Sequence, residues 1–216
     1  MAYVQYLDGR YSLWIRQTGT ASALEIVQPE PGVTLFGATI APSGAYVDFV
    51  RRSGLPFDLW RVALLGGTPK RVIENVYSPI GWSSDGRHIA FVRVDIQHLE
   101  TQLVVADSSG GNTRVLAHHR LPVQFVSLMI AARPSIAPAW SPNGRSIAVV
   151  VIGARGNAGI EDMDVVDVAT GSEKMMPLPS TDVRGTEWLE DTSLIVSTAV
   201  KESEPVQLWR LSYPDG

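Results

Sequence analysis

Short apolar runs follow one another along the whole chain, and each is bounded by glycine, proline, asparagine, aspartate or serine. Apolar runs bounded in this way are typical of β-strands joined by tight turns. No segment shows a sustained helical period of apolar and polar positions. The pattern therefore predicts an all-β chain.

One unit recurs four times in the chain: a bulky residue, a four-residue turn and an apolar run. The bulky residues of the four units are Ile40, Trp82, Trp140 and Trp188. A second series of positions, within third strands, is Trp14, Trp60, Val104, Val166 and Trp209. Both series recur about every 40–60 residues, which is close to the period of a propeller blade. The repeats predict a β-propeller built from four-stranded antiparallel blades.

The repeated turns contain pairs of residues that favour a tight hairpin. Asp85-Gly86 and Asn143-Gly144 each tolerate the positive φ that such a hairpin needs. Ser83 and Ser141 occupy the same position of the repeat, so both are interpreted as turn residues whose hydroxyls bond local backbone. All six tryptophans fall at repeat positions, and we expect them to fill the wedge between neighbouring blades.

The strand tally gives three complete blades between two incomplete ones within a single domain, residues 1–216. The expected boundaries are residues 1–30 (partial), 31–75, 76–119, 133–180 and 181–216 (partial), with an insertion at 120–138. We expect a fragment of a longer propeller; the alternative is an unusual closure that combines the two incomplete blades. Open blade edges carry unpaired backbone groups, so the tally also predicts self-association through these edges.

Composition and charge narrow the class of function. The formal charge is −4 and the 18 lysines and arginines are scattered, whereas a nucleic-acid binder needs a concentrated basic face. The absence of cysteine excludes disulfides and thiolate metal ligands. The longest apolar run, 147–154, is far shorter than a membrane helix requires. We expect no nucleic acid and no membrane segment in this chain, and both a cytoplasmic and an extracytoplasmic bacterial location stay open.

Two of the repeats resemble a known family. WSSDGRHIAF (82–91) and WSPNGRSIAV (140–149) are similar to the TolB-like propeller repeat, W-S-P-D-G-x-x-I-A-F, while IAPSGAYVDF and WLEDTSLIVS keep only its spacing and strand pattern. The resemblance covers nearly the whole chain and implies a propeller fold. Residues 59–93 and 207–216 also resemble the propeller attached C-terminally to bacterial serine/threonine protein kinases, which implies a sensor or scaffold region.

Motifs that would carry catalysis are missing from the sequence. The stretch 81–85, GWSSD, lacks the second glycine of a G-x-S-x-G nucleophile elbow, and neither a Walker loop nor a kinase H-R-D with D-F-G is present. We therefore predict a non-catalytic segment without a cofactor. For the parent protein, a kinase sensor is the leading hypothesis; the gating propeller of a prolyl-oligopeptidase-type peptidase and a TolB-like periplasmic scaffold are the alternatives.

Histidines and acidic residues give no clear metal motif. The sequence contains four histidines, of which His118 and His119 are expected on opposite faces of a strand. We interpret the histidines as incidental surface residues and expect no metal site. Asp162 and Asp164 share one strand face, which is either an exposed edge or a weak cation site, and the solvated edge is favoured.

Two groups of residues are candidates for ligand contact. The first group lies at the starts of inner strands and is expected to face the channel: Ser78, Ser135 and Arg184. The second group belongs to the unusually apolar loop 121–138 and offers a surface for a partner: Phe125, Leu128, Met129 and Ile130. The loop can also cap the channel or pack on a neighbouring blade. The expected partner is a protein or a small-molecule ligand.

Overall fold

The chain folds into five small antiparallel sheets. The computed structural model describes residues 1–20, 22–128, 136–153, 161–176, 178, 182–199 and 205–215, and these residues form strands and turns without a helix. Accordingly, the described residues include no helix long and apolar enough to span a membrane. The all-β prediction is confirmed.

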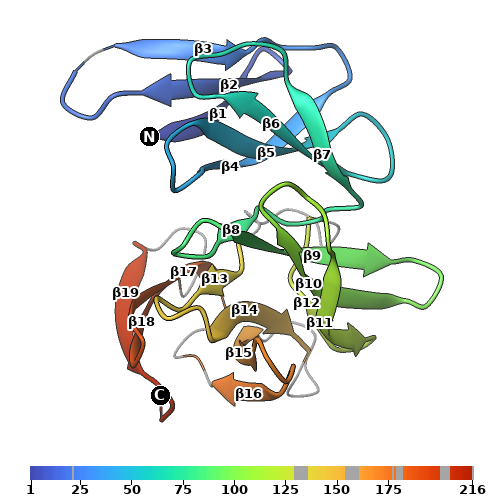
Figure 1. The fold of residues 1–216 in the computed structure, drawn as a ribbon, viewed down its shortest axis with the longest axis vertical. Helices are drawn as coiled ribbons and strands as arrows, with labels where there is room; N and C mark the ends of the chain where they lie inside the picture. The colour runs from blue at the N-terminus through green and yellow to red at the C-terminus, as the bar shows by residue number, and fades with distance from the viewer. Residues whose placement is uncertain are drawn as a thin grey trace.

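Each sheet is one blade, and the blades follow chain order around a common centre (Figure 1). Blade 1 contains β1 (Ala2–Leu7), β2 (Arg10–Arg16) and β3 (Ala23–Val27). Blade 2 contains β4 (Thr34–Ile40), β5 (Tyr46–Arg52), β6 (Asp58–Ala63) and β7 (Lys70–Glu74). Blade 3 contains β8 (Gly81–Trp82), β9 (His88–Asp95), β10 (Glu100–Asp107) and β11 (Arg114–Arg120).

The last two blades differ in how they are completed. Blade 4 contains β13 (Ala139–Trp140), β14 (Ser146–Ile152), β15 (Glu161–Asp167) and β16 (Glu173–Met176), and β12 (Gln124–Phe125) pairs with the same β14. Blade 5 contains β17 (Val183–Glu190), β18 (Ser193–Thr198) and β19 (Gln207–Ser212). Three complete blades thus lie between two three-stranded ones, as the strand tally predicts, and β12 adds a fifth strand to the sheet of blade 4.

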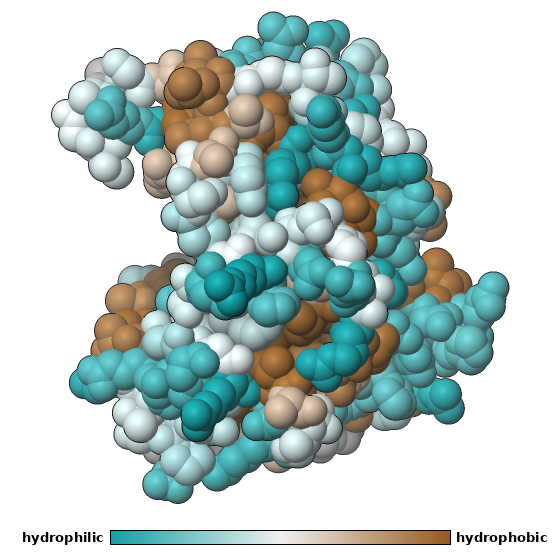
Figure 2. All heavy atoms as spheres, viewed as in Figure 1, coloured by the Kyte–Doolittle hydropathy of each residue, from teal (hydrophilic) through white to brown (hydrophobic). Residues whose placement is uncertain are grey.

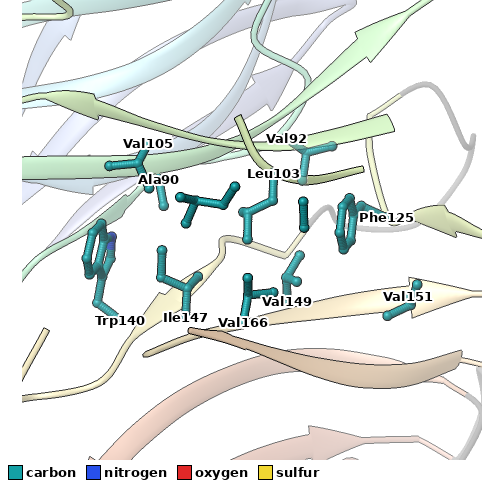
Figure 3. Close-up of a cluster of buried hydrophobic side chains, with 12 residues drawn as sticks. Ala90, Val92, Leu103, Val105, Phe125, Trp140, Ile147, Val149, Val151 and Val166 are labelled. Carbon is teal, nitrogen blue, oxygen red and sulfur yellow. The ribbon is translucent and has the colours of Figure 1, made fainter. Parts of the chain in front are cut away.

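The apolar core is divided among the interfaces between neighbouring blades. Four buried clusters form it, one between each consecutive pair of blades. Figure 3 shows the cluster between blades 3 and 4, where Leu103 from β10 faces Ile147 from β14, and both are fully buried. The inward faces of the strands are therefore held by the next blade, because a single thin sheet cannot bury its own two faces.

The two well-conforming repeat turns have the same hydrogen bonds. The Ser83 hydroxyl donates to Asp85 Oδ1 at 2.6 Å and accepts the His88 N–H at 2.9 Å. The Ser141 hydroxyl donates to Asn143 Oδ1 and accepts the Ser146 N–H, both at 2.9 Å. Ser83 is thus a turn residue, as the repeat predicts, and its hydroxyl is engaged in holding a hairpin.

Tryptophan indoles join one blade to the next. The Trp140 indole N–H donates to the Gly81 carbonyl at 3.1 Å, and the Trp188 indole N–H donates to the Ala139 carbonyl at 3.0 Å. Each acceptor directly precedes the tryptophan position of the preceding blade. The prediction that every tryptophan is a core residue is wrong for Trp209, which is 39% exposed on β19, because none of the described residues pairs with or covers the outer edge of that strand.

The first part of the insertion, residues 120–128, is described by the structure and packs into the domain. Phe125 is fully buried in the cluster between blades 3 and 4, and its N–H donates to the Thr101 hydroxyl at 2.8 Å. Leu128 is half-buried against the cluster between blades 2 and 3, and its N–H donates to the Tyr77 carbonyl at 2.7 Å. The remaining two residues of the expected partner surface, Met129 and Ile130, lie outside the described residues.

Candidate functional site

The four innermost strands of blades 2 to 5 converge on one pocket, which we call the axial pocket. Its walls come from β4, β8, β13 and β17 and from the residues that lead into them, and its volume is about 310 Å³. The lining residues are Thr39, Ile80, Gly81, Trp82, Ala137, Pro138, Ala139, Trp140, Thr186 and Glu187. This volume is at the lower end of the range for small-ligand sites.

Polar groups in the axial pocket are few. The buried Oγ1 atom of Thr186 has no hydrogen-bond partner within the described part of the chain. Glu187, next to it, is exposed as a residue, yet the atoms packed around its carboxyl desolvate that group and raise its pKa. The Thr39 hydroxyl donates to the Ile80 carbonyl at 3.3 Å. The pocket lining therefore includes one carboxylate and one threonine whose buried hydroxyl is without a partner among the described residues.

The wall of the axial pocket is closely packed between blades 3 and 4. A Cβ atom added at Gly81 would lie 1.8 Å from the Pro138 carbonyl oxygen, so only glycine allows β8 to approach the residues before β13 this closely. The indole bond from Trp140 to the Gly81 carbonyl holds the same approach. Close backbone contact of this kind makes a rigid wall for a ligand.

A second cleft lies on the turn side of blades 3 and 4. Its volume is about 380 Å³, and Ser83, Asp85 and Asn143 are among the residues that line it. The side chains of these three residues are engaged in the repeated turn bonds described above. These three polar side chains thus hold hairpin corners, whereas the Thr186 hydroxyl in the lining of the axial pocket has no partner among the described residues.

Of the sequence-predicted channel residues, Ser78 lies in the core and Arg184 is not among the residues that line the axial pocket. Ser78 is fully buried; its hydroxyl donates to the Pro79 carbonyl and accepts the Val92 N–H, both at 2.8 Å. Arg184 lies on β17 and donates to Asp182 at 2.7 Å. Ser135 lies outside the described residues. In each of these three blades, the residues that line the axial pocket come two or more positions later in the sequence than the predicted residue.

Strands from blades 3 and 4 bring together one histidine and two carboxylates. His119 Nε2 on β11 lies 3.2 Å from Asp164 Oδ2 on β15 and 3.0 Å from Glu173 Oε2 on β16. The bond from Asp164 raises the pKa of His119, and burial raises the pKa of Glu173. Asp164 is 5% exposed, so the expectation of a solvated acidic edge is wrong at this residue, and His119 is more than an incidental surface histidine.

Solved structures similar to this chain are propellers. TolB from Acinetobacter baumannii superposes with a TM-score of 0.72 at 13% identity, over 100% of this chain and 50% of that one. A protein assigned as TolB from Agrobacterium tumefaciens gives 0.67 at 19% identity, over 94% and 66%. Acylaminoacyl peptidase from Pyrococcus horikoshii gives 0.58 at 15% identity, over 98% and 36%.

These similarities establish the fold class, a TolB-like β-propeller. No family model matches the chain, and no curated protein matches it in sequence. The chain spans between half and two thirds of the length of the two TolB structures. The same fold occurs in proteins with different activities, so the site and not the fold must carry any argument about function.

Proposed function

We propose that the chain is a non-catalytic binding propeller whose ligand occupies the axial pocket. The observation that carries this proposal is a pocket walled by four inner strands, whose lining includes the Glu187 carboxylate and Thr186, a residue whose buried hydroxyl has no partner among the described residues. A buried hydroxyl without a partner costs free energy, which a ligand donor or acceptor recovers on binding. The lack of catalytic motifs in the sequence also supports a binding role.

The chemistry of the axial pocket favours a cationic ligand group. Glu187 is the charged residue in the lining, and no lysine or arginine is among the lining residues. The Trp82 and Trp140 side chains add aromatic surface, which also attracts cations. An amine or guanidinium group of a small molecule or a peptide side chain meets these conditions, so a protein partner and a small ligand share the same recognition chemistry.

Titration with short peptides tests the proposal, because the two pocket tryptophans report binding through their fluorescence. We expect tri-arginine amide to change the emission and to bind with at least tenfold higher affinity than tri-glutamate. Glu187→Gln should weaken tri-arginine binding about tenfold, since a charge-assisted bond becomes a neutral one. Thr186→Val should weaken it less, about threefold to tenfold, through loss of one hydroxyl contact.

A matched control is available on the same strand. Glu190 is an exposed glutamate of β17 and is not part of the pocket lining, so Glu190→Gln should leave the affinity unchanged. Equal affinities of the unmodified chain, Glu187→Gln and Thr186→Val would count against the axial pocket as the site. Arg184 and Leu128 stay candidate contacts, and Arg184→Glu tests the first of them in the same titration.

We further propose that the propeller is the sensor or scaffold region of a larger bacterial signalling protein such as a serine/threonine kinase. The likeness of residues 59–93 and 207–216 to kinase-attached propellers supports this role. Sequencing the parent gene before the codon for residue 1 tests this role. The expected finding is a coding region for a kinase domain with its H-R-D and D-F-G motifs.

Two alternatives for the parent protein have specific support. Acylaminoacyl peptidase and prolyl endopeptidase structures contain propellers that match 98% of this chain, which favours the gating propeller of a peptidase. The TolB matches favour a periplasmic scaffold. A downstream G-x-S-x-G followed by aspartate and histidine in the parent gene distinguishes the peptidase, and an export signal without either enzyme domain distinguishes the scaffold.

A further inference from the structure

We infer that His119, Asp164 and Glu173 form a binding site for Zn²⁺ or a similar first-row divalent ion at the interface of blades 3 and 4. The site lies away from the axial pocket and goes beyond the binding role proposed above. An imidazole nitrogen and two carboxylate oxygens are ligands that Zn²⁺ takes in proteins.

The distances within the triad fit tetrahedral coordination. Ligand atoms at about 2.0–2.2 Å from a tetrahedral Zn²⁺ lie about 3.3–3.6 Å from one another. His119 Nε2 lies 3.2 Å from Asp164 Oδ2 and 3.0 Å from Glu173 Oε2, and the ligand atoms of all three residues lie within 4.8 Å of one another. The two distances from His119 Nε2 thus differ from the tetrahedral spacing by only a few tenths of an ångström.

The strands hold the three side chains in place from two directions. Asp164 pairs with Met175 and Val166 pairs with Glu173 in the β15–β16 ladder, so Asp164 and Glu173 are diagonal neighbours on one face of blade 4. His119 reaches this face from β11 of blade 3. The buried Phe125 ring packs edge-on against the His119 ring, with 4.5 Å between the ring centroids, and restricts the orientation of the imidazole.

Charge and hydrogen bonding also favour a divalent ion over a proton in the triad. The Nε2 atom carries one hydrogen at most, so it can donate fully to only one of the two carboxylates that face it. An imidazolium between two carboxylates leaves a net charge of about −1 in a half-buried place, whereas a divalent ion neutralises both.

Access for an ion and for further ligands comes from the solvent side. The side chains of His119 and Glu173 are 20% and 29% exposed, against 7% for Asp164. Three protein ligands leave a fourth tetrahedral position for water or for a group from a partner. Ca²⁺ and Mg²⁺ are disfavoured, since these hard ions take oxygen ligands and one of the three ligand atoms is an imidazole nitrogen.

Calorimetric titration of the chelator-treated chain with ZnCl₂ tests the inference. We expect one Zn²⁺ per chain, with CaCl₂ and MgCl₂ giving no comparable heat. Glu173→Gln and His119→Gln should each weaken Zn²⁺ binding at least tenfold, because each removes a ligand. Co²⁺ should give the intense visible absorption of a tetrahedral complex in the unmodified chain and lose it in both variants.

The matched control is a second histidine–carboxylate pair in blade 3, the blade that contains His119. His98 Nδ1 lies 2.8 Å from Asp95 Oδ2, a histidine with a single carboxylate, so His98→Gln should leave Zn²⁺ affinity unchanged. Circular dichroism establishes that each variant is folded. The inference is overturned if the unmodified chain does not bind Zn²⁺ stoichiometrically. It is also overturned if the folded Glu173→Gln and His119→Gln variants bind Zn²⁺ as tightly as the unmodified chain does. A proton-bridged ion pair would then explain the triad.

Discussion

At the scale of single residues, the serine of the repeated turn is the clearest local stabiliser. Ser83 is 3% exposed and its hydroxyl both donates and accepts within the turn. Ser83→Ala should lower the free energy of unfolding by about 1–2 kcal/mol, because it leaves the His88 N–H without its acceptor. Urea denaturation measures the change, and Ser53→Ala, at an exposed serine after β5, should have no effect.

Asp85 in the same turn makes stability depend on pH. The Ser83 hydroxyl and the Arg87 N–H bond the carboxylate and lower the pKa of Asp85 below its ordinary value of 3.8. A carboxyl whose folded pKa is lowered contributes stability above the unfolded pKa, and this contribution is lost as the pH falls through the folded pKa.

Asp85→Asn tests this dependence, since Asn143 fills the same position in the next repeat. We expect the melting temperature of the variant to lie slightly below that of the unmodified chain at about pH 6, and the difference to vanish by about pH 2. A difference that does not change between these pH values would show that the carboxylate bonds contribute nothing to stability.

The residues of the two sites show which contacts the sequence could not reveal. The role of Ser83 could be predicted because Ser141 repeats it at the same place and every partner is local in sequence. Thr186 and His119 gave no such signal, because the groups around them come from strands far apart in the chain. The burial of Asp164 likewise depends on the neighbouring blade, which a strand pattern does not display.

At the scale of elements, the approach of β8 to the start of β13 depends on one glycine. Gly81→Ala would place a Cβ atom 1.8 Å from the Pro138 carbonyl oxygen, so the two inner strands must separate. We expect a loss of about 3 kcal/mol or more in the free energy of unfolding, because the clash is with backbone and not with a flexible side chain. Denaturant titration measures it.

Gly111 provides the control for this substitution. A Cβ atom at Gly111 would meet its nearest neighbour, the Ser109 hydroxyl oxygen, at 3.8 Å, an ordinary contact. Gly111→Ala should therefore change stability by less than about 0.5 kcal/mol. If Gly81→Ala is equally mild, then the close approach of β8 and the Pro138 segment is not needed for the fold.

At the scale of the whole molecule, the repeat period predicted the propeller because each blade must be covered by the next. The two spaced series of bulky residues sufficed to predict three complete blades between two three-stranded ones, but not the fifth strand, β12, in the sheet of blade 4. They could not predict the axial pocket, since its lining depends on how far each inner strand reaches. Nor could they predict that the insertion returns to bond Tyr77 through Leu128.

The outer edge of blade 5 is the surface on which self-association is most strongly expected. β19 pairs with β18 alone among the described strands. Apolar side chains lie on the surface there, at the lower left of Figure 2, and Leu208 and Trp209 are 73% and 39% exposed. An unpaired strand edge with apolar side chains pairs readily with another strand, and a second copy of this chain supplies one.

Leu208→Lys should abolish this association, because a charge on an edge strand opposes pairing with a second copy. Sedimentation velocity over a range of concentrations should show reversible dimers of the unmodified chain and a monomer for the variant. Leu65→Lys is the control: Leu65 is 84% exposed in the turn between β6 and β7 and offers no strand edge. If both variants dissociate the dimer equally, then exposed apolar area in general drives association; if the unmodified chain is a monomer at every concentration, then the edge of β19 does not pair.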